Sequence, residues 1–68
     1  MKLTKKGINI LQNDISLRNR IALLFDCSEA SVRRWVIENE DNGDLTKFEA
    51  IQLIKKETKL EQSSLYEK

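Results

Sequence analysis

Residues 18–37 have the spacing of two short helices that cross over a tight turn. Ala22 supplies the small side chain that a close crossing needs, and Asp26 follows four residues later at the turn. Val32 comes ten residues after Ala22 and Trp35 thirteen after it, so both are expected to point back at the earlier helix. Helices that cross at roughly 90–120° over a short turn touch at few points, which must be small or apolar. This stretch therefore predicts two helices joined by a tight corner.

The rest of the composition agrees with a helical domain. A chain of 68 residues has room for one domain with a small core. It has no proline and only two glycines, and it is rich in Leu, Ile, Lys and Glu, a mixture that favours helix over strand. We expect a single all-α domain over residues 1–68 with four to five short helices.

Apolar residues at spacings of three and four indicate where the helices lie. The expected helices span residues 5–13, 17–25, 29–39, 47–57 and 62–67. Thr4, Ser16 and Ser28 are the predicted N-caps of the first three, because a hydroxyl oxygen can accept from the free N–H groups of a first turn. Thr46 and Glu49 fit the capping-box pattern at the start of the fourth.

The same spacing predicts which side of each helix is buried. The expected core positions are Leu17, Ile21, Leu24, Phe25, Val32, Trp35, Val36, Phe48, Ile51, Ile54, Leu60, Leu65 and Tyr66. Trp35 is assigned to the core and not to base stacking, because its spacing to Val32 and Ala22 turns it inward. Cys27 is expected to fill the corner as a small hydrophobic side chain.

Residues 40–44, Glu-Asp-Asn-Gly-Asp, predict a loop between the third and fourth helices. The Asn-Gly pair could instead form a tight hairpin turn. Neither flank shows the sustained alternation of β-forming residues that a hairpin requires, so we favour the loop.

Charge is distributed unevenly along the chain. Residues 1–34 carry seven basic and three acidic side chains, whereas residues 35–68 carry five basic and eight acidic ones. All four arginines lie between positions 18 and 34. A basic half permits a nucleic-acid-binding face even where the net charge is only +1, but it also permits an ordinary solvated surface.

Several kinds of chemistry are missing from the sequence. The single cysteine cannot form a disulfide within the chain, and without any histidine it has no partner for a Cys–His nucleophile or an ordinary zinc site. The carboxylates are scattered, and there is no glycine-rich phosphate loop. No run of residues is apolar enough for a signal peptide or a membrane span. We therefore expect a cytoplasmic protein that is not an enzyme and has no catalytic residue, metal, cofactor or small-molecule ligand.

The corner resembles the helix-turn-helix of phage repressor and Cro-like proteins and of related small bacterial regulators. The match rests on Ala22, Asp26-Cys27, Val32 and Trp35, and the flanking helices extend it to most of the chain. It departs at Asp26, because the family usually has Gly at this turn, although Asp also tolerates the left-handed backbone. The resemblance implies a lambda-repressor-like fold and a transcriptional regulator that binds double-stranded DNA in a sequence-specific manner.

The resemblance also places the helix that begins at Ser28 in the major groove, where its N-terminal part faces the bases. Its predicted base contacts are Ser28, Glu29, Ala30, Arg33 and Arg34. Arginine can bind guanine through two hydrogen bonds or grip a phosphate; we favour Arg33 for the base and Arg34 for the phosphate, although the roles could be exchanged. Glu29 could accept from a cytosine amino group, but we favour a role at the positive end of the helix dipole. A Glu29–Arg33 ion pair on a solvated surface is the simpler alternative.

The predicted phosphate contacts are Ser16, Arg18, Asn19, Ser31, Thr46 and Lys47. In the resembled family the start of the second helix abuts the DNA backbone, and free N–H groups at a helix start suit a phosphate. For Thr46 the cap role alone would explain the residue. Lys2, Lys5 and Lys6 form either a basic arm or, as we favour, a solubilising tail.

A homodimer on a palindromic site is expected, because one copy offers few contacts and half-sites lie about one helical turn apart. Leu65 and Tyr66 are the best candidates for its surface, but they could equally be buried within one copy. The alternative function is a small helical protein-interaction module that does not bind DNA. In that case the acidic residues 38–44 would contact a basic partner.

Overall fold

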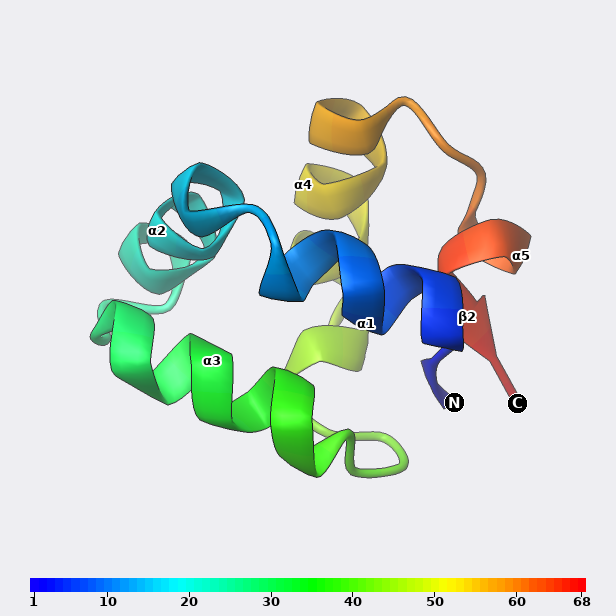
Figure 1. Ribbon diagram of the computed structural model, residues 1–68, viewed down its shortest axis with the longest axis horizontal. Helices are drawn as coiled ribbons and strands as arrows, with labels where there is room; N and C mark the ends of the chain where they lie inside the picture. The colour runs from blue at the N-terminus through cyan, green and yellow to red at the C-terminus, as the bar shows by residue number, and fades with distance from the viewer.

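Five helices surround one hydrophobic core in the computed structural model, which describes residues 1–68 (Figure 1). The helices are α1 (Lys5–Gln12), α2 (Ile15–Leu24), α3 (Glu29–Glu38), α4 (Phe48–Thr58) and α5 (Gln62–Leu65). A 3₁₀ turn, η1 (Asp44–Thr46), precedes α4, and two short strands pair with each other, β1 (Lys2–Leu3) and β2 (Tyr66–Glu67). The predicted all-α fold is confirmed. None of these helices combines the length and the apolar character that a membrane crossing requires.

The corner between α2 and α3 has the geometry that the sequence predicts. Asp26 has a φ of 53°, in the left-handed region that a tight turn needs. The N–H of Cys27 donates to the carbonyl of Ala22 at 2.9 Å, which closes the turn. Ala22 and Val32 are both buried, and Cys27 is half-buried against the core. These contacts fix α3 across α2.

Trp35 covers this corner from the outside of the core. Its ring packs edge-to-face against the ring of Phe25, with 5.7 Å between the ring centroids. Trp35 packs against the core, as predicted, but it is only half-buried, because its other side lines a hollow on the surface.

Two of the predicted N-caps are confirmed and one is wrong. The side-chain oxygens of Thr4 and Ser28 each accept from the backbone N–H three residues later, at the starts of α1 and α3. Ser16 does not cap α2. Asp14 does so, because its carboxylate accepts from the N–H of Leu17 at 3.0 Å, and α2 therefore begins two residues earlier than predicted.

The capping box predicted at Thr46 is also wrong. Thr46 ends η1, and its hydroxyl donates to the carbonyl of Gly43 at 2.6 Å instead of accepting from α4. Lys47 takes the N-cap position of α4 with an extended backbone and no side-chain cap. The predicted loop at residues 40–44 is present, and its last residue enters η1.

Two residues predicted for the core lie on the surface. Leu24, at the end of α2, is 44% exposed, and Phe48, at the start of α4, is 71% exposed. The buried side of α4 is formed by Ala50, Ile51 and Ile54. At about 100° per residue, Phe48 lies about 60° from Ile51 around the helix, and this spacing suggested a shared side. It also lies about 160° from Ala50 and about 120° from Ile54, so it falls outside the buried side.

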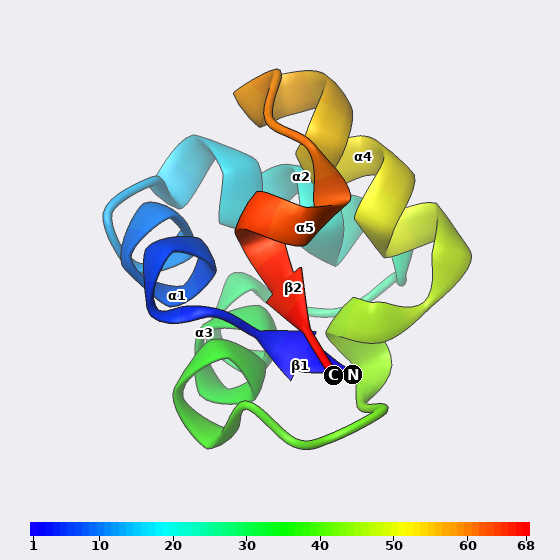
Figure 2. The ribbon, with the colours of Figure 1, turned by 90° about the vertical axis from the view of Figure 1, so that its right-hand side faces the viewer.

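The last predicted helix is shorter than expected, because the chain leaves it to pair with the N-terminus. α5 ends at Leu65, and Tyr66 pairs with Leu3 in an antiparallel ribbon (Figure 2). Leu65 and Tyr66 are both buried within one copy, which removes them from any dimer surface. Lys2 belongs to the ribbon and not to a free arm.

Two side chains fasten this ribbon to the helical body. The hydroxyl of Tyr66 donates to the carbonyl of Leu45 at 2.6 Å, and burial raises the pKa of this hydroxyl well above its ordinary value. Asn39, which ends α3 in the left-handed conformation, accepts from the N–H of Leu3 at 2.8 Å and donates to its carbonyl at 3.1 Å. The ends of the chain are thereby joined to the end of α3 and to the segment before α4.

Candidate nucleic-acid interface

The outer face of α3, the centre of the predicted interface, is exposed to solvent. α3 lies at the edge of the molecule, with the other helices on one side of it (Figure 1). Val32 and Val36 are fully buried on its inner side. Arg34 lies midway between them in sequence, about 200° around the helix from each, so it occupies the centre of the outer face. Ala30 and Ile37 are exposed on either side of it along the helix.

The two arginines of α3 are both exposed but differ in their surroundings. Arg34 has only a loose ion pair with Glu38, with 4.0 Å between the nitrogen and the oxygen, and both side chains are largely exposed. Such a pair contributes little, so a phosphate or a base can displace it. Arg33 makes no ion pair, and the Glu29–Arg33 pair considered from the sequence is absent because Glu29 binds another arginine.

That other arginine is Arg18, which was predicted to bind a phosphate. Arg18 is only 7% exposed and donates through Nε to the carboxylate of Glu29 at 2.7 Å. Its Nη1 donates to the carbonyls of Leu11 and Gln12, at 2.6 and 2.7 Å. The side chains of Arg18 and Glu29 therefore bind each other within the protein, and neither points outward where it could contact DNA.

A signal for this burial was present in the sequence. Position 18 lies four residues before Ala22 and three before Ile21, so it shares the buried side of α2 with both. Arg18 was predicted to lie at the surface because an arginine is seldom buried without a partner, and the partners of Arg18 lie on other helices.

The remaining predicted contacts are spread over three helix starts. Ser16 and Asn19 are exposed near the beginning of α2. Ser28 and Ser31 share a hydrogen bond between their hydroxyls at 3.1 Å, at the start of α3. Lys47 lies before α4, where its Nζ is 3.1 Å from Asp44 and 5.5 Å from the centre of the Phe25 ring.

The basic residues of the first half do not all converge on α3. Arg18 is turned inward, and Arg20 forms an ion pair with Glu57 of α4 at 3.1 Å. Arg33 and Arg34 are thus the only arginines on the outer face of α3. The basic surface around α3 therefore contains fewer arginines than the seven basic side chains of residues 1–34 suggested.

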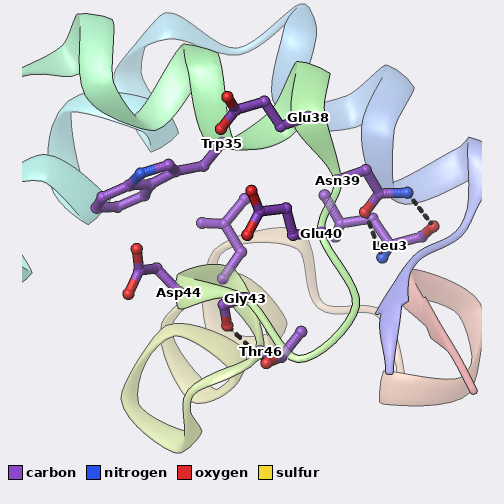
Figure 3. Close-up of a pocket in the computed structure, with 9 residues that line it drawn as sticks. Leu3, Trp35, Glu38, Asn39, Glu40, Gly43, Asp44 and Thr46 are labelled. Atoms are coloured by element: carbon purple, nitrogen blue, oxygen red, sulfur yellow. Dashed lines mark hydrogen bonds between the residues drawn. The ribbon is translucent and has the colours of Figure 1, made fainter.

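An acidic hollow of about 210 Å³ lies beside the C-terminal end of α3 (Figure 3). Its lining is formed by Leu3, Trp35, Glu38, Asn39, Glu40, Gly43, Asp44, Leu45 and Thr46. Figure 3 shows the Trp35 ring on one side, with the carboxylates of Glu38, Glu40 and Asp44 around the opening. No basic side chain lines it, and no group of acidic or cysteine side chains in the chain has the geometry of a metal site.

The acidic side chains around this hollow differ in whether they form an ion pair. Asp44 is paired with Lys47, and Asp41 in the same loop binds the N-terminal amine. The hydrogen bond and the charge of that amine hold the pKa of Asp41 below its ordinary value. Glu40 has no ion pair. The C-terminal end of α3 is also the negative end of its dipole, so this side of α3 repels phosphate.

Comparison of the chain with models of protein families, with curated proteins and with solved structures gave no match.

Proposed function

We propose that this protein is a cytoplasmic transcriptional regulator of the phage repressor and Cro-like kind, which binds double-stranded DNA with α3 in the major groove. The observation that carries the proposal is the outer face of α3, where Arg34 stands between the small Ala30 and the apolar Ile37. Small residues near the start of the helix allow its backbone to approach the bases closely. The opposite side is locked by Val32 and Val36, so the face is rigidly presented.

Within this proposal, Arg34 reads a base and Arg33 grips a phosphate. The sequence favoured the reverse assignment and left the exchange open. The position of Arg34 at the centre of the outer face favours the exchange, because the centre of a docked helix lies deepest in the groove. Ile37 and Ala30 can contact the methyl group of a thymine beside the guanine that Arg34 binds.

Phosphates would be bound at the sides of the groove. Ser16 and Asn19 lie near the start of α2, where free N–H groups favour an anion. Arg33 and Lys47 supply the positive charge. Each copy then neutralises about two to three phosphates, so the logarithm of affinity should fall with the logarithm of salt with a slope of about −2 to −3 per copy.

So few contacts favour a homodimer on a palindromic site, with half-sites about one helical turn apart. Leu65 and Tyr66 belong to the core, so the surface between the two copies lies elsewhere on the molecule.

The test is a selection of bound sequences from a random duplex library, followed by titrations of the selected duplex. Arg34→Ala should lose about 1–3 kcal/mol on the selected duplex, and its preference at one base pair should relax. Arg20→Ala is the matched control, because Arg20 is an exposed arginine that pairs with α4 and lies off α3. The proposal fails if no sequence is enriched, or if Arg34→Ala and Arg33→Ala bind the selected duplex as the wild type does.

The acidic hollow favours one alternative, a protein-interaction module that takes a basic partner. Trp35 and the three carboxylates at its opening could receive a cationic side chain. This alternative predicts that Glu40→Gln weakens binding to a basic partner and that Arg34→Ala does not. DNA binding predicts the opposite ranking on a duplex.

A further inference from the structure

The buried Arg18 joins three helices at a single point. It belongs to α2, and its guanidinium contacts the last turn of α1 and the first residue of α3. Nη1 donates to the carbonyls of Leu11 and Gln12 at 2.6 and 2.7 Å, and Nε donates to Glu29 at 2.7 Å. No other side chain in the protein forms hydrogen bonds to two helices besides its own.

The chemistry of this junction suits an arginine. Carbonyls at the C-terminal end of a helix have no partner within the helix and carry partial negative charge. A planar guanidinium can bind them on one edge and a carboxylate on another, with a fixed angle between the two. A lysine ammonium has no such fixed fork. A buried arginine also needs its partners, because an uncompensated buried charge is strongly destabilising. The three helices are therefore held at the angles that keep all three acceptors in place.

Glu29 is the residue through which this junction reaches α3. It is the first residue of the helix, directly after the cap Ser28. Arg34 lies five residues further along, which is about 7.5 Å of helix. A change in the tilt or rotation of α3 at Glu29 therefore moves the side chain that faces the groove. Base contacts through two hydrogen bonds depend on the placement of the arginine more than phosphate contacts do.

We infer that Arg18 is a positioning residue, which sets the angle of α3 through Glu29 and so controls sequence-specific binding without touching DNA. This inference rests on the proposed function. It replaces the phosphate role expected for Arg18 and the base role expected for Glu29, since either role would require the side chain to leave its partners.

The test compares wild type with the double variant Arg18→Met/Glu29→Met. Replacing a buried ion pair by apolar side chains of similar size is often neutral for stability, so the variant keeps a folded helical domain, which circular dichroism checks. Its affinity for the selected duplex should fall by about 5- to 150-fold, the range over which one base contact discriminates. Its affinity for unrelated duplexes and its salt slope should stay unchanged, because Arg18 neutralises no phosphate. Arg20→Met is the matched control and should bind as wild type does.

A second variant keeps the inference testable if the double variant loses its fold. Glu29→Gln keeps the size of the side chain and weakens the pair by removing its charge. It should lower affinity for the selected duplex in the same direction, with an unchanged salt slope and with the same preferred sequence. A changed preference at a single base pair would return Glu29 to a base contact and overturn the inference.

The other outcomes separate this inference from the proposed function. A salt slope shallower by about 0.9 in the double variant, with weaker binding to every duplex, would mean that Arg18 binds a phosphate. Unchanged specific affinity in a folded variant would remove the positioning role and leave the proposed function standing. If wild type enriches no duplex, the proposed function fails and the positioning role fails with it.

Discussion

A Cβ atom on Gly7 would lie 2.5 Å from the carbonyl oxygen of Leu65, which is closer than a carbon atom can approach. This contact brings the first turn of α1 directly against α5. The hydroxyl of Thr4 donates to the carbonyl of Ser64 at 2.8 Å, and the N–H of Thr4 donates to the carbonyl of Leu65 at 2.9 Å. Gly7 is therefore present because two backbone segments meet at this point, although glycine disfavours a helix.

Gly7→Ala should destabilise the protein by about 1–3 kcal/mol, because the added methyl group must push α5 away from α1. The free energy of unfolding from urea titration measures this. Gly43→Ala is the comparison in a loop: Gly43 has a φ of −76°, and its Cβ would meet the carbonyl oxygen of Glu40 at 3.2 Å, so its cost should be smaller than that of Gly7→Ala. A Gly7→Ala variant that gains stability, as helix propensity alone would predict, would contradict this packing.

Tyr66→Phe should destabilise the protein by about 1–3 kcal/mol. The substitution keeps the ring in the core but leaves the carbonyl of Leu45 without the hydroxyl that now donates to it. Thermal or urea unfolding gives the change. An unaltered free energy of unfolding would show that water or another donor reaches the Leu45 carbonyl.

The stability of the protein should also fall at alkaline pH through Tyr66. Burial raises the pKa of this hydroxyl in the folded state above its unfolded value of about 10. The stabilising effect is therefore complete below about pH 10 and is lost as the pH rises above it. The chain has one tyrosine, so absorbance at 295 nm follows this group alone. The Tyr66→Phe variant should lose this part of the pH dependence, and a tyrosine that ionises near pH 10 without unfolding would contradict the burial.

Removing charge from the acidic hollow should strengthen binding to DNA of any sequence. Glu38→Gln and Glu40→Gln each take away a carboxylate beside the C-terminal end of α3, where a phosphate would be repelled. We expect an increase on the order of a few-fold at low salt that fades as salt screens it. Glu67→Gln, on the terminal ribbon, is the control and should bind as wild type does. Equal effects of all three would mean that only the net charge matters.

The parts of the fold that could be predicted are those whose causes are local. The turn at Asp26 and the caps Thr4 and Ser28 depend on residues a few positions apart, and all three are as predicted. Phe48 was misplaced because its spacing to Ile51 is helical, but the side of α4 that is buried is chosen by packing against other elements. Local patterns also give no information about which distant segments meet.

The candidate site shows the same division. The exposure of Arg33 and Arg34 follows from their spacing to Val32, which is local. The spacing of Arg18 to Ile21 and Ala22 indicates its buried side, but its partners are carbonyls of α1 and Glu29 of α3, which no spacing within α2 reveals. The ribbon at the chain ends was missed because two-residue strands are too short to show an alternating pattern.

The pairing of Leu3 with Tyr66 joins residues 63 positions apart, so it cannot form before residue 66 has been synthesised. Asn39 holds the end of α3 to Leu3, and Leu3 is held in turn by Tyr66. A helix of ten residues such as α3 is marginal without packing against the rest of the protein. The helix that carries Arg34 is therefore fixed in place only when nearly the whole chain is available.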